Sequence, residues 1–396
     1  MCACGRSAAR AGCPDVAAAA DIRRILVMKF RSPGDVLLMV PALKALRRGF
    51  PGARIAAAVN AEAAGLLELH PAVDEVMPYE RRERRTSLAA RARLEWELFR
   101  RVRGGRFELA VNATEGDRGA LLALASGAMV RLGLAQEGGA LKRLKNRLYH
   151  HLLPPWPRER HNVMANLDLM ALLGLDVSDR RVEVALHGKE VAAVEQRLNA
   201  AGIEPGEPIV HVHAPSRVSY KCWTPEGMAA VIDHLERERR LKVVLSGAPE
   251  DKPYVWRIVD LCESRPLSVA GRLTLRETAA LAGRACLFFG VDTVVMHLAA
   301  AQDTPVVALF GPTYASAWGP WDNAGPEAQY PEPRGVQRSG PHTLIQSGRR
   351  CVPCGNMGCG RSGRSACLEE LSASEVIAVL DAALDRALAA PQVTSS

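Results

Sequence analysis

Short apolar runs that end in turn residues recur along the first part of the chain. The run Arg24 to Phe30 is followed by a Ser-Pro-Gly turn and predicts a strand buried on both faces. A helical pattern over 36–49 is interrupted by Pro41, which predicts a kink or a restart there. Apolar runs at 53–59 and 73–77 predict two further strands. The alternation of strands and helices predicts a parallel, doubly wound sheet.

The later part of the chain repeats this alternation. Strands are predicted at 208–213, 241–246, 285–290 and 306–310, with helices at 225–238, 293–301 and 371–389. Ser372 and Glu375 form a capping box at the start of the last helix. Residues 313–350 are rich in Gly, Pro and Trp and predict loops. The pattern therefore predicts an α/β protein with two halves.

A length of 396 residues exceeds one ordinary hydrophobic core and predicts two domains. We expect a flexible leader at 1–21, an N-terminal domain at 22–190 and a C-terminal domain at 191–396. The last helix either stays with the C-terminal domain or packs back on the N-terminal one. The leader has no continuous apolar segment of the kind that a secretory signal needs, and no run reaches the ~20 apolar residues of a membrane span.

The formal net charge of +8 favours an anionic partner. Nucleic acid, an acidic membrane surface and a phosphorylated substrate all fit, and charge alone does not choose among them. The Arg-rich segment 81–106 predicts a helix with a basic face. Such a helix is either an ordinary solvated surface or a surface that meets anionic lipid or a phosphorylated acceptor.

Ten cysteines are too few for a disulfide scaffold in a chain of this length. Four of them cluster near the C-terminus, at Cys351, Cys354, Cys359 and Cys367. Without an export signal the thiols are expected to be reduced, so this cluster is a candidate for a structural zinc site. Its spacing is irregular for a zinc ribbon, and plain thiols are the alternative.

Polar residues follow several of the predicted strands, where open α/β sheets place their ligands. Asp35 stands at the mouth of a helix, either as an ordinary cap or as a carboxylate directed at a site by the preceding turn. Ser216 and Lys221 follow the strand 208–213, beside a helix N-terminus that suits phosphate. Lys221 is the candidate for binding a diphosphate.

A third group of polar residues follows the strand 285–290. Asp292 and Thr293 are natural helix caps, and the first N–H groups of the helix could take phosphate oxygens. His297 lies about one turn further on, either as a ligand of the site or as a core histidine. Neither Gly-x-Gly-x-x-Gly nor a Walker A pattern occurs, which argues against a dehydrogenase or a P-loop ATPase.

Taken together, these segments resemble the ADP-heptose:lipopolysaccharide heptosyltransferases, glycosyltransferase family 9. The cysteine tail resembles that of a branch named heptosyltransferase III-like. The stretches that carry the resemblance follow one another in the family's order: Lys29–Leu37, Pro41–Leu43, Lys221–Pro225, Ser246–Pro249, Gly290–Thr293, Met296–Ala300, Leu309–Thr313 and Trp318–Trp321.

The resemblance implies the GT-B architecture, in which two Rossmann-like domains face a cleft. The acceptor belongs to the N-terminal domain and the nucleotide-sugar to the C-terminal one. It implies an inverting, metal-independent transferase that needs no cofactor, with Asp35 as the catalytic base and Lys221 neutralising the leaving diphosphate. The residues that it assigns to the donor are Ser216, Glu250, Asp292, Thr293 and His297.

The function expected from this resemblance is transfer of a heptose from ADP-heptose to the lipopolysaccharide inner core. The protein would then be cytoplasmic and peripheral at the anionic inner membrane, with no nucleic acid partner. Val294 stands where the family has a glycine, which keeps open a family 9 transferase with another nucleotide-sugar or acceptor. A non-catalytic basic binding protein on a transferase fold is the alternative from another class.

Overall fold

The computed structural model describes residues 22–80 and 87–389, so the predicted leader at 1–21 lies outside the described residues. The chain forms two compact units. The N-terminal unit runs to Pro157 and resumes over Val163–Arg180, and the C-terminal unit takes Arg158–Asn162 and everything from Arg181 onward. The chain therefore passes into the C-terminal unit at Arg181, ahead of the boundary that the sequence predicts at 190.

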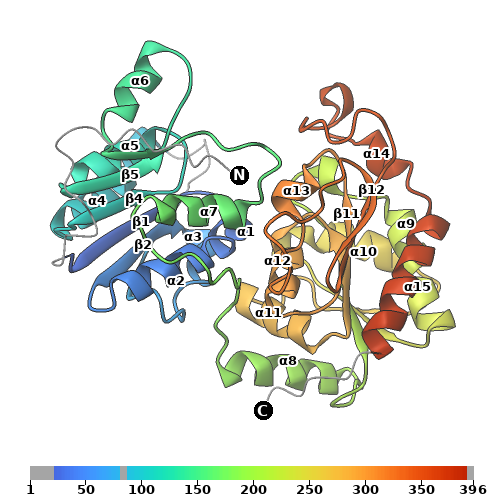
Figure 1. Cartoon of the computed structure of the whole chain (residues 1–396). Helices are drawn as coiled ribbons and strands as arrows, with labels where there is room; N and C mark the ends of the chain where they lie inside the picture. Colours follow the sequence, from blue (N-terminus) through green and yellow to red (C-terminus); the bar gives the residue numbers. More distant parts are fainter. Residues whose placement is uncertain (1–21, 81–86, 390–396) are drawn as a thin grey trace. The chain divides into compact units, whose positions relative to one another are not determined.

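The N-terminal unit is built on a parallel sheet with the strand order β3-β2-β1-β4-β5-β6 (Figure 1). Its strands are β1 (Arg24–Lys29), β2 (Arg54–Asn60), β3 (Glu75–Tyr79), β4 (Leu109–Asn112), β5 (Val130–Leu134) and β6 (His151–Leu153). The doubly wound parallel sheet expected from the sequence is confirmed. Because β2 and β4 lie on opposite sides of β1, the winding reverses there.

Helices cover both faces of this sheet (Figure 1). They are α1 (Pro33–Leu37), α2 (Val40–Gly49), α3 (Ala61–Ala64), α4 (Leu88–Gly104), α5 (Asp117–Ala125), α6 (Ala140–Asn146) and α7 (Asn162–Ala171). Leu26 and Met28 of β1 pack with α4 and α5, whereas Val27 faces α2 and α7. Pro41 lies in the first turn of α2, where its missing N–H breaks no helical bond, so the predicted restart is confirmed.

The C-terminal unit has a sheet with the order β12-β13-β11-β10-β7-β8-β9. Its strands are β7 (Ile209–His213), β8 (Lys242–Leu245), β9 (Leu267–Ser268), β10 (Leu287–Val291), β11 (Val306–Phe310), β12 (Gly335–Ser339) and β13 (His342–Gln346). All neighbours are parallel except β12 and β13. The prediction of loops over 313–350 is wrong at this hairpin, whose strand β13 is wholly buried and includes the polar His342 and Gln346.

The helices of this unit also lie on both faces of its sheet. They are α8 (Gly188–Ala200), α9 (Pro225–Asp233), α10 (Lys252–Leu261), α11 (Leu275–Arg284), α12 (Val294–Ala301), α13 (Ala315–Trp318), α14 (Ala366–Glu369) and α15 (Ala373–Ala389). Val376 and Leu380 of α15 join the core that α9 and α10 form with β7. The last helix thus packs within the C-terminal unit, as the first of the two expected alternatives has it.

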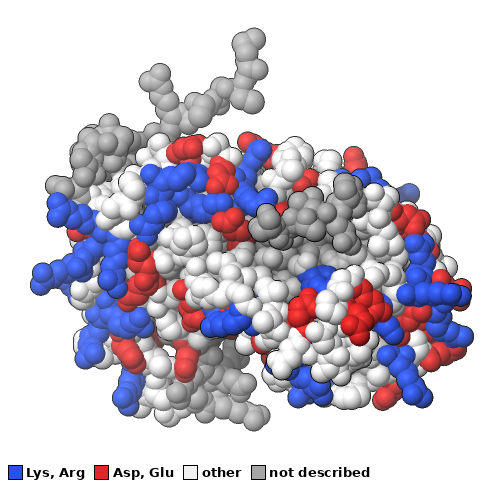
Figure 2. All heavy atoms as spheres, turned by 90° about the horizontal axis from the view of Figure 1, so that it is seen from below, with Lys and Arg blue, Asp and Glu red and all other residues white. Residues whose placement is uncertain are grey.

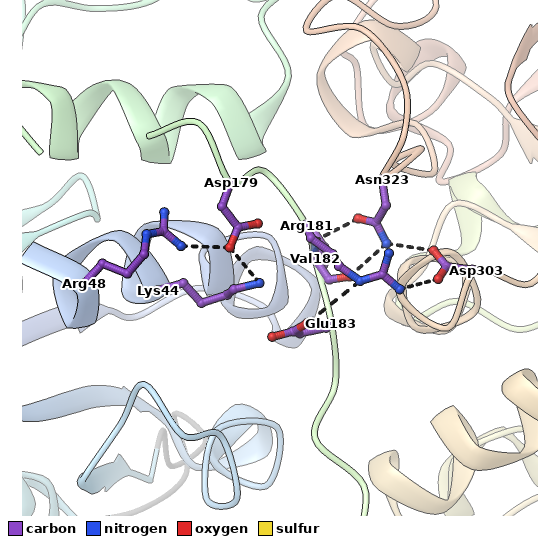
Figure 3. Close-up of polar contacts among 8 residues, drawn as sticks. All are labelled: Lys44, Arg48, Asp179, Arg181, Val182, Glu183, Asp303 and Asn323. Carbon is purple, nitrogen blue, oxygen red and sulfur yellow. Dashed lines mark hydrogen bonds and ion pairs between the residues drawn. The ribbon is translucent and has the colours of Figure 1, made fainter. Parts of the chain in front are cut away.

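Polar contacts hold the chain on either side of the passage from one unit to the other (Figure 3). Within the N-terminal unit, Oδ2 of Asp179 lies 3.0 Å from Nζ of Lys44 and 2.8 Å from Nη1 of Arg48, both on α2. Within the C-terminal unit, the backbone N–H of Val182 donates to Oδ1 of Asn323 at 2.8 Å. Asn323 Nδ2 in turn donates to the Val182 carbonyl at 3.1 Å. Each unit therefore anchors its own end of this segment.

No helix among the described residues combines the length and the apolar character that crossing a membrane requires. On the face shown in Figure 2, Lys and Arg side chains are interspersed with Asp and Glu. The net positive charge is therefore not gathered into one uninterrupted field on that face.

Candidate active site

Asp35 lies just past the carboxyl end of β1, in the first turn of α1, and is 8% exposed. Its Oδ2 accepts a 2.5 Å hydrogen bond from the Ser32 hydroxyl, and Nε of Arg31 lies 3.8 Å from its Oδ1. Ser32 is the N-cap residue, yet its side chain makes no capping bond to the helix backbone. The side chains of the two neighbouring residues Ser32 and Arg31 thus hold the carboxylate of Asp35. Because Ser32 is the N-cap residue, the alternative that Asp35 is an ordinary N-cap is wrong.

The loop that carries Asp35 is held from both neighbouring strands. Nδ2 of Asn60, at the end of β2, donates to the Arg31 carbonyl at 3.0 Å. On the other side, the backbone N–H of Phe30 donates to Oγ1 of Thr114, just after β4, at 2.9 Å. These contacts fix the loop at the point where the sheet reverses its winding, which is where open α/β sheets bind ligands.

Lys29, the last residue of β1, is a buried cation that the sequence analysis did not single out. Its Nζ donates to Oδ1 of Asn166 at 3.0 Å, and Nδ2 of Asn166 donates to the Leu38 carbonyl at 3.1 Å. Burial lowers the pKa of Lys29 to about 8, against the opposing charge of Asp35. A lysine inside an otherwise apolar strand was the signal for it in the sequence.

In the C-terminal unit, the structure brings Lys221 and Asp292 together. Lys221 ends a 3₁₀ turn (Ser219–Lys221) that follows β7, and Asp292 follows β10, the adjacent strand. Nζ of Lys221 lies 2.7 Å from Oδ2 of Asp292, which is buried. An ammonium group has three N–H donors, so Lys221 can hold Asp292 and still donate to a phosphate oxygen.

Thr293 is the N-cap residue of α12, but its side chain makes no capping hydrogen bond. Its Oγ1 is buried and has no hydrogen-bond partner among the described residues. A buried hydroxyl without a partner is costly, so this position suits a ligand oxygen. The next residue, Val294, packs its side chain against the core around Phe288 and Tyr330.

Ser216 and Glu250 follow neighbouring strands at the same edge of the sheet. Ser216 is half-buried, and its Oγ accepts a 3.4 Å hydrogen bond from the Val218 N–H. Glu250 is exposed in the 3₁₀ turn Pro249–Asp251 after β8. No hydrogen bond or ion pair within the described parts of the chain joins either residue to Lys221 or Asp292. Their assignment to the donor stays a prediction.

His297 is buried on α12, next to a second histidine that the sequence analysis missed. That residue, His161, stacks on Trp321 with ring centroids 4.6 Å apart, and its Nε2 is 3.1 Å from the Gly319 carbonyl. The pKa of His161 is lowered to about 3, mainly by burial and to a smaller extent by nearby His297, against the opposing effect of the hydrogen bond to Gly319. A histidine directly before the helix at Asn162 was the available signal.

Two further histidines, on β7, supply no charge to the site. His211 Nε2 and His213 Nδ1 lie 2.7 and 2.9 Å from the same hydroxyl, Oγ of Ser246. Burial lowers the pKa of His211 to about 3 and that of His213 to about 4. Both are therefore neutral at neutral pH, and neither brings a positive charge to this edge of the sheet.

The cysteine tail packs beside the turn that carries Lys221. The Ser219 hydroxyl donates to the Gly363 carbonyl at 2.8 Å, and the Gly355 N–H donates to the Pro312 carbonyl at 2.8 Å. Cys367 is buried, and its pKa is raised to about 11, first by burial and then by the three neighbouring thiols of the tail. In residues 22–80 and 87–389, no three His, Cys, Asp or Glu side chains form a group that could hold a metal ion. The zinc site stays a prediction.

Residues 95–329 match the family described as glycosyltransferase family 9 (heptosyltransferase). The chain belongs to glycosyltransferase family 9. Lipopolysaccharide heptosyltransferase 3 of Escherichia coli is 28% identical over 299 residues, which cover 74% of this chain and 85% of that relative. The expected family and the expectation of a transferase enzyme are confirmed.

Solved structures of this family share the fold of the transferase. The family 9 glycosyltransferase of Veillonella parvula DSM 2008 has a TM-score of 0.77 at 22% identity, over 92% of this chain and 98% of that one. The Escherichia coli heptosyltransferase WaaC with ADP has a TM-score of 0.65 at 21% identity, over 91% and 99% of the two chains. The expected GT-B class of two Rossmann-like units is thereby confirmed.

Proposed function

We propose that this transferase moves a heptose from ADP-heptose to the inner core of lipopolysaccharide, with inversion at the anomeric carbon and without a catalytic metal. The observation that carries the proposal is the ion pair of Lys221 with Asp292, 2.7 Å long, beside the free hydroxyl of Thr293 at the start of α12. Relatives named lipopolysaccharide heptosyltransferase 3 and 1, and the relative bound to ADP, support this donor and this acceptor.

In this proposal Asp35 takes the proton of the acceptor hydroxyl. The acceptor oxygen forms a bond to the anomeric carbon from one face, while the bond from that carbon to the diphosphate oxygen breaks on the other. The electron pair leaves with ADP, whose charge meets the ammonium of Lys221 and the N-terminus of α12. Ser32 and Arg31 hold the carboxylate of Asp35 in place for the proton transfer.

We further place the transferase at the cytoplasmic face of the inner membrane, in contact with anionic lipid and without a nucleic acid partner. A lipid-linked acceptor is presented at such a surface, and the net charge of +8 favours it. Zinc held by Cys351, Cys354, Cys359 and Cys367 is a separate hypothesis with a structural role only. Metal analysis and turnover of the purified protein before and after chelation test it. We expect zinc to be bound before chelation and turnover to be the same after the zinc has been removed.

Isothermal titration with ADP and UDP, and then with ADP-heptose, tests the donor. Preference for ADP, followed by heptose transfer to a truncated lipopolysaccharide acceptor, is the expected result. Preference for UDP would instead favour a family 9 transferase with another nucleotide-sugar. Binding of neither nucleotide would favour a non-catalytic binding protein on this fold.

A further inference from the structure

Two neighbouring helices of the N-terminal unit, α4 and α5, run side by side in the same direction. Near the start of α5, Nη2 of Arg118 donates to Oε1 of Glu95 on α4 at 2.7 Å. Past the end of α5, a Cβ on Gly127 would lie 3.0 Å from Nη1 of Arg103, near the end of α4. The helices thus keep one register over their length, and their outer sides face away from the same sheet.

The outer sides of these two helices carry large apolar side chains. Trp96 and Phe99 on α4 stack with ring centroids 5.4 Å apart, and Trp96 is 61% exposed. On α5, Leu121 and Leu124 are 62% and 49% exposed. The register of Glu95 with Arg118 sets these four residues at the same level on adjacent helices. Single exposed apolar residues are ordinary, but a contiguous group indicates a binding surface.

The short helix α6 extends this surface at the start of α5. The ammonium of Lys145 on α6 pairs with Oδ1 of Asp117, the first residue of α5. No residue of α6 is buried, and Leu141 and Leu144 are both more than half exposed. In Figure 1, α6 stands out from the sheet beyond α5. A helix that buries nothing against its own fold has an apolar side to offer to something else.

Positive charge surrounds these apolar residues. Lys142, Arg143 and Arg147 are exposed on and after α6, and the chain has no acidic residue between 138 and 150. On α4 the exposed basic side chains include Arg93, Arg100 and Arg103, and the acidic ones are the exposed Glu97 and Glu95, which pairs with Arg118. Apolar and aromatic side chains flanked by Lys and Arg are the composition of helices that lie in the interface of an anionic bilayer.

We propose that the outer sides of α4, α5 and α6 form the surface by which the transferase docks on anionic lipid. Trp96, Phe99, Leu121, Leu124, Leu141 and Leu144 enter the interface, while the flanking Lys and Arg side chains meet lipid phosphates. A protein partner or a second copy would equally cover apolar side chains, but it would not require the run of basic residues on α6. The inference rests on the proposed action at a membrane and names the surface for it.

Co-sedimentation of the full chain with vesicles tests the proposal. We expect binding to equimolar phosphatidylcholine and phosphatidylglycerol, little binding to phosphatidylcholine alone, and weaker binding as salt is added. Replacing Lys142 and Arg143 with Gln should weaken the binding about fivefold for each charge removed. Leu121→Ser with Leu124→Ser, and Leu141→Ser with Leu144→Ser, should weaken it about tenfold for each leucine that inserts.

The matched control is Trp256→Ser with Leu261→Ser on α10, two residues that are 54% and 43% exposed in the C-terminal unit. Equal losses in the control and in the α4–α6 variants would overturn the proposal. The proposal would also be overturned if light scattering showed a dimer of the unaltered chain and monomers of the leucine variants, because the surface would then join two copies. Quenching by brominated lipid should fall in Trp96→Phe, and an unchanged signal would also count against the proposal.

Titration with ADP and transfer to a delipidated acceptor are measured on the same variants. Both should remain at the level of the unaltered chain, since these side chains lie outside the proposed reaction centre. If the unaltered chain transferred heptose but did not bind the vesicles, the docking surface alone would be overturned. If the unaltered chain did not bind ADP, the proposed function would be overturned.

Discussion

The ammonium of Lys221 lies 2.7 Å from Oδ2 of Asp292. Both residues belong to the C-terminal unit, but they follow different strands and are far apart in the sequence. They meet because β7 and β10 are adjacent and parallel, with His213 opposite Gly290 at their carboxyl ends. Asp292 is 6% exposed at its side chain and Lys221 is 24% exposed. A buried carboxylate with one cationic partner is sensitive to the loss of that partner.

The first prediction concerns this pair. Lys221→Gln should weaken ADP binding about tenfold or more, because a charge-assisted hydrogen bond contributes roughly 1.5–3 kcal/mol. It should also lower the free energy of unfolding by about 1–2 kcal/mol, a figure reduced for the partial exposure of Lys221. Titration and urea denaturation measure the two effects.

The double variant Lys221→Gln/Asp292→Asn separates these effects. It should regain stability relative to Lys221→Gln, since no unpaired carboxylate remains, but it should not regain ADP affinity. Lys242→Gln, at the exposed start of β8, is the control and should change neither quantity. If the double variant lost as much stability as the two single variants together, Lys221 and Asp292 would not stabilise one another.

The second prediction concerns Asp35. Asp35→Asn keeps the shape of the side chain but removes the base, so kcat should fall about 10²–10⁴-fold while the Kd for ADP stays unchanged. Steady-state kinetics and calorimetry check the two halves of this statement. Asp260→Asn, an exposed residue on α10, is the control. Full turnover by Asp35→Asn would remove Asp35 from the mechanism.

The third prediction follows from the buried Lys29. Burial lowers its pKa from 10.5 to about 8, so the unfolded chain binds more protons between these two values. The free energy of unfolding should therefore rise with pH across this interval, by up to ~1.4 kcal/mol per pH unit from this one group. Lys29→Met should flatten the rise in urea denaturation, whereas Lys242→Met should retain it. The same slope in both variants would contradict the assignment.

The fourth prediction concerns acid. The C-terminal unit buries His161, His211, His213 and His342, whose pKa values are lowered to about 3, 3, 4 and 4. Below pH 6.5 these histidines are protonated in the unfolded chain but remain neutral in the folded unit. The free energy of unfolding therefore decreases as the pH falls from 6.5 towards 4. Each group contributes a slope of up to ~1.4 kcal/mol per pH unit.

His211→Gln should reduce this acid slope by about one proton, as measured by urea denaturation at several pH values. The control is His187→Gln, since His187 is exposed. An equal reduction by the two variants would show that the slope does not come from buried histidines.

The fifth prediction tests the close approach of β7 and β10. A Cβ on Gly290 would lie 2.5 Å from the His213 carbonyl oxygen, so Gly290→Ala must force the strands apart. We expect a loss of about 1–3 kcal/mol in unfolding free energy and weaker ADP binding, because Asp292 lies two residues further along the chain. Gly188→Ala meets nothing within 4 Å and serves as the control. A stability of Gly290→Ala equal to that of the control would contradict this account.

Short apolar runs predicted most of the buried strands, and β11 has the predicted limits of 306–310. The hairpin of β12 and β13 was not predicted, because its buried residues include polar ones. Nε2 of Gln346 donates to the Gly311 and Thr313 carbonyls at 2.9 and 2.8 Å, which satisfies the amide inside the protein. A pattern of hydrophobicity cannot predict that a polar side chain is buried when its hydrogen-bond partners lie in another loop.

For the site, the sequence by itself determined which residue types follow which strands, because strand ends and turns are local features of the chain. It thereby singled out Asp35, Lys221 and Asp292. Only the tertiary structure decided that Lys221 pairs with Asp292, that Lys29 is buried beside the charge of Asp35, and that His211 and His213 share Ser246. The physical reason is that strand order, which depends on packing across the whole sheet, sets which strand ends meet.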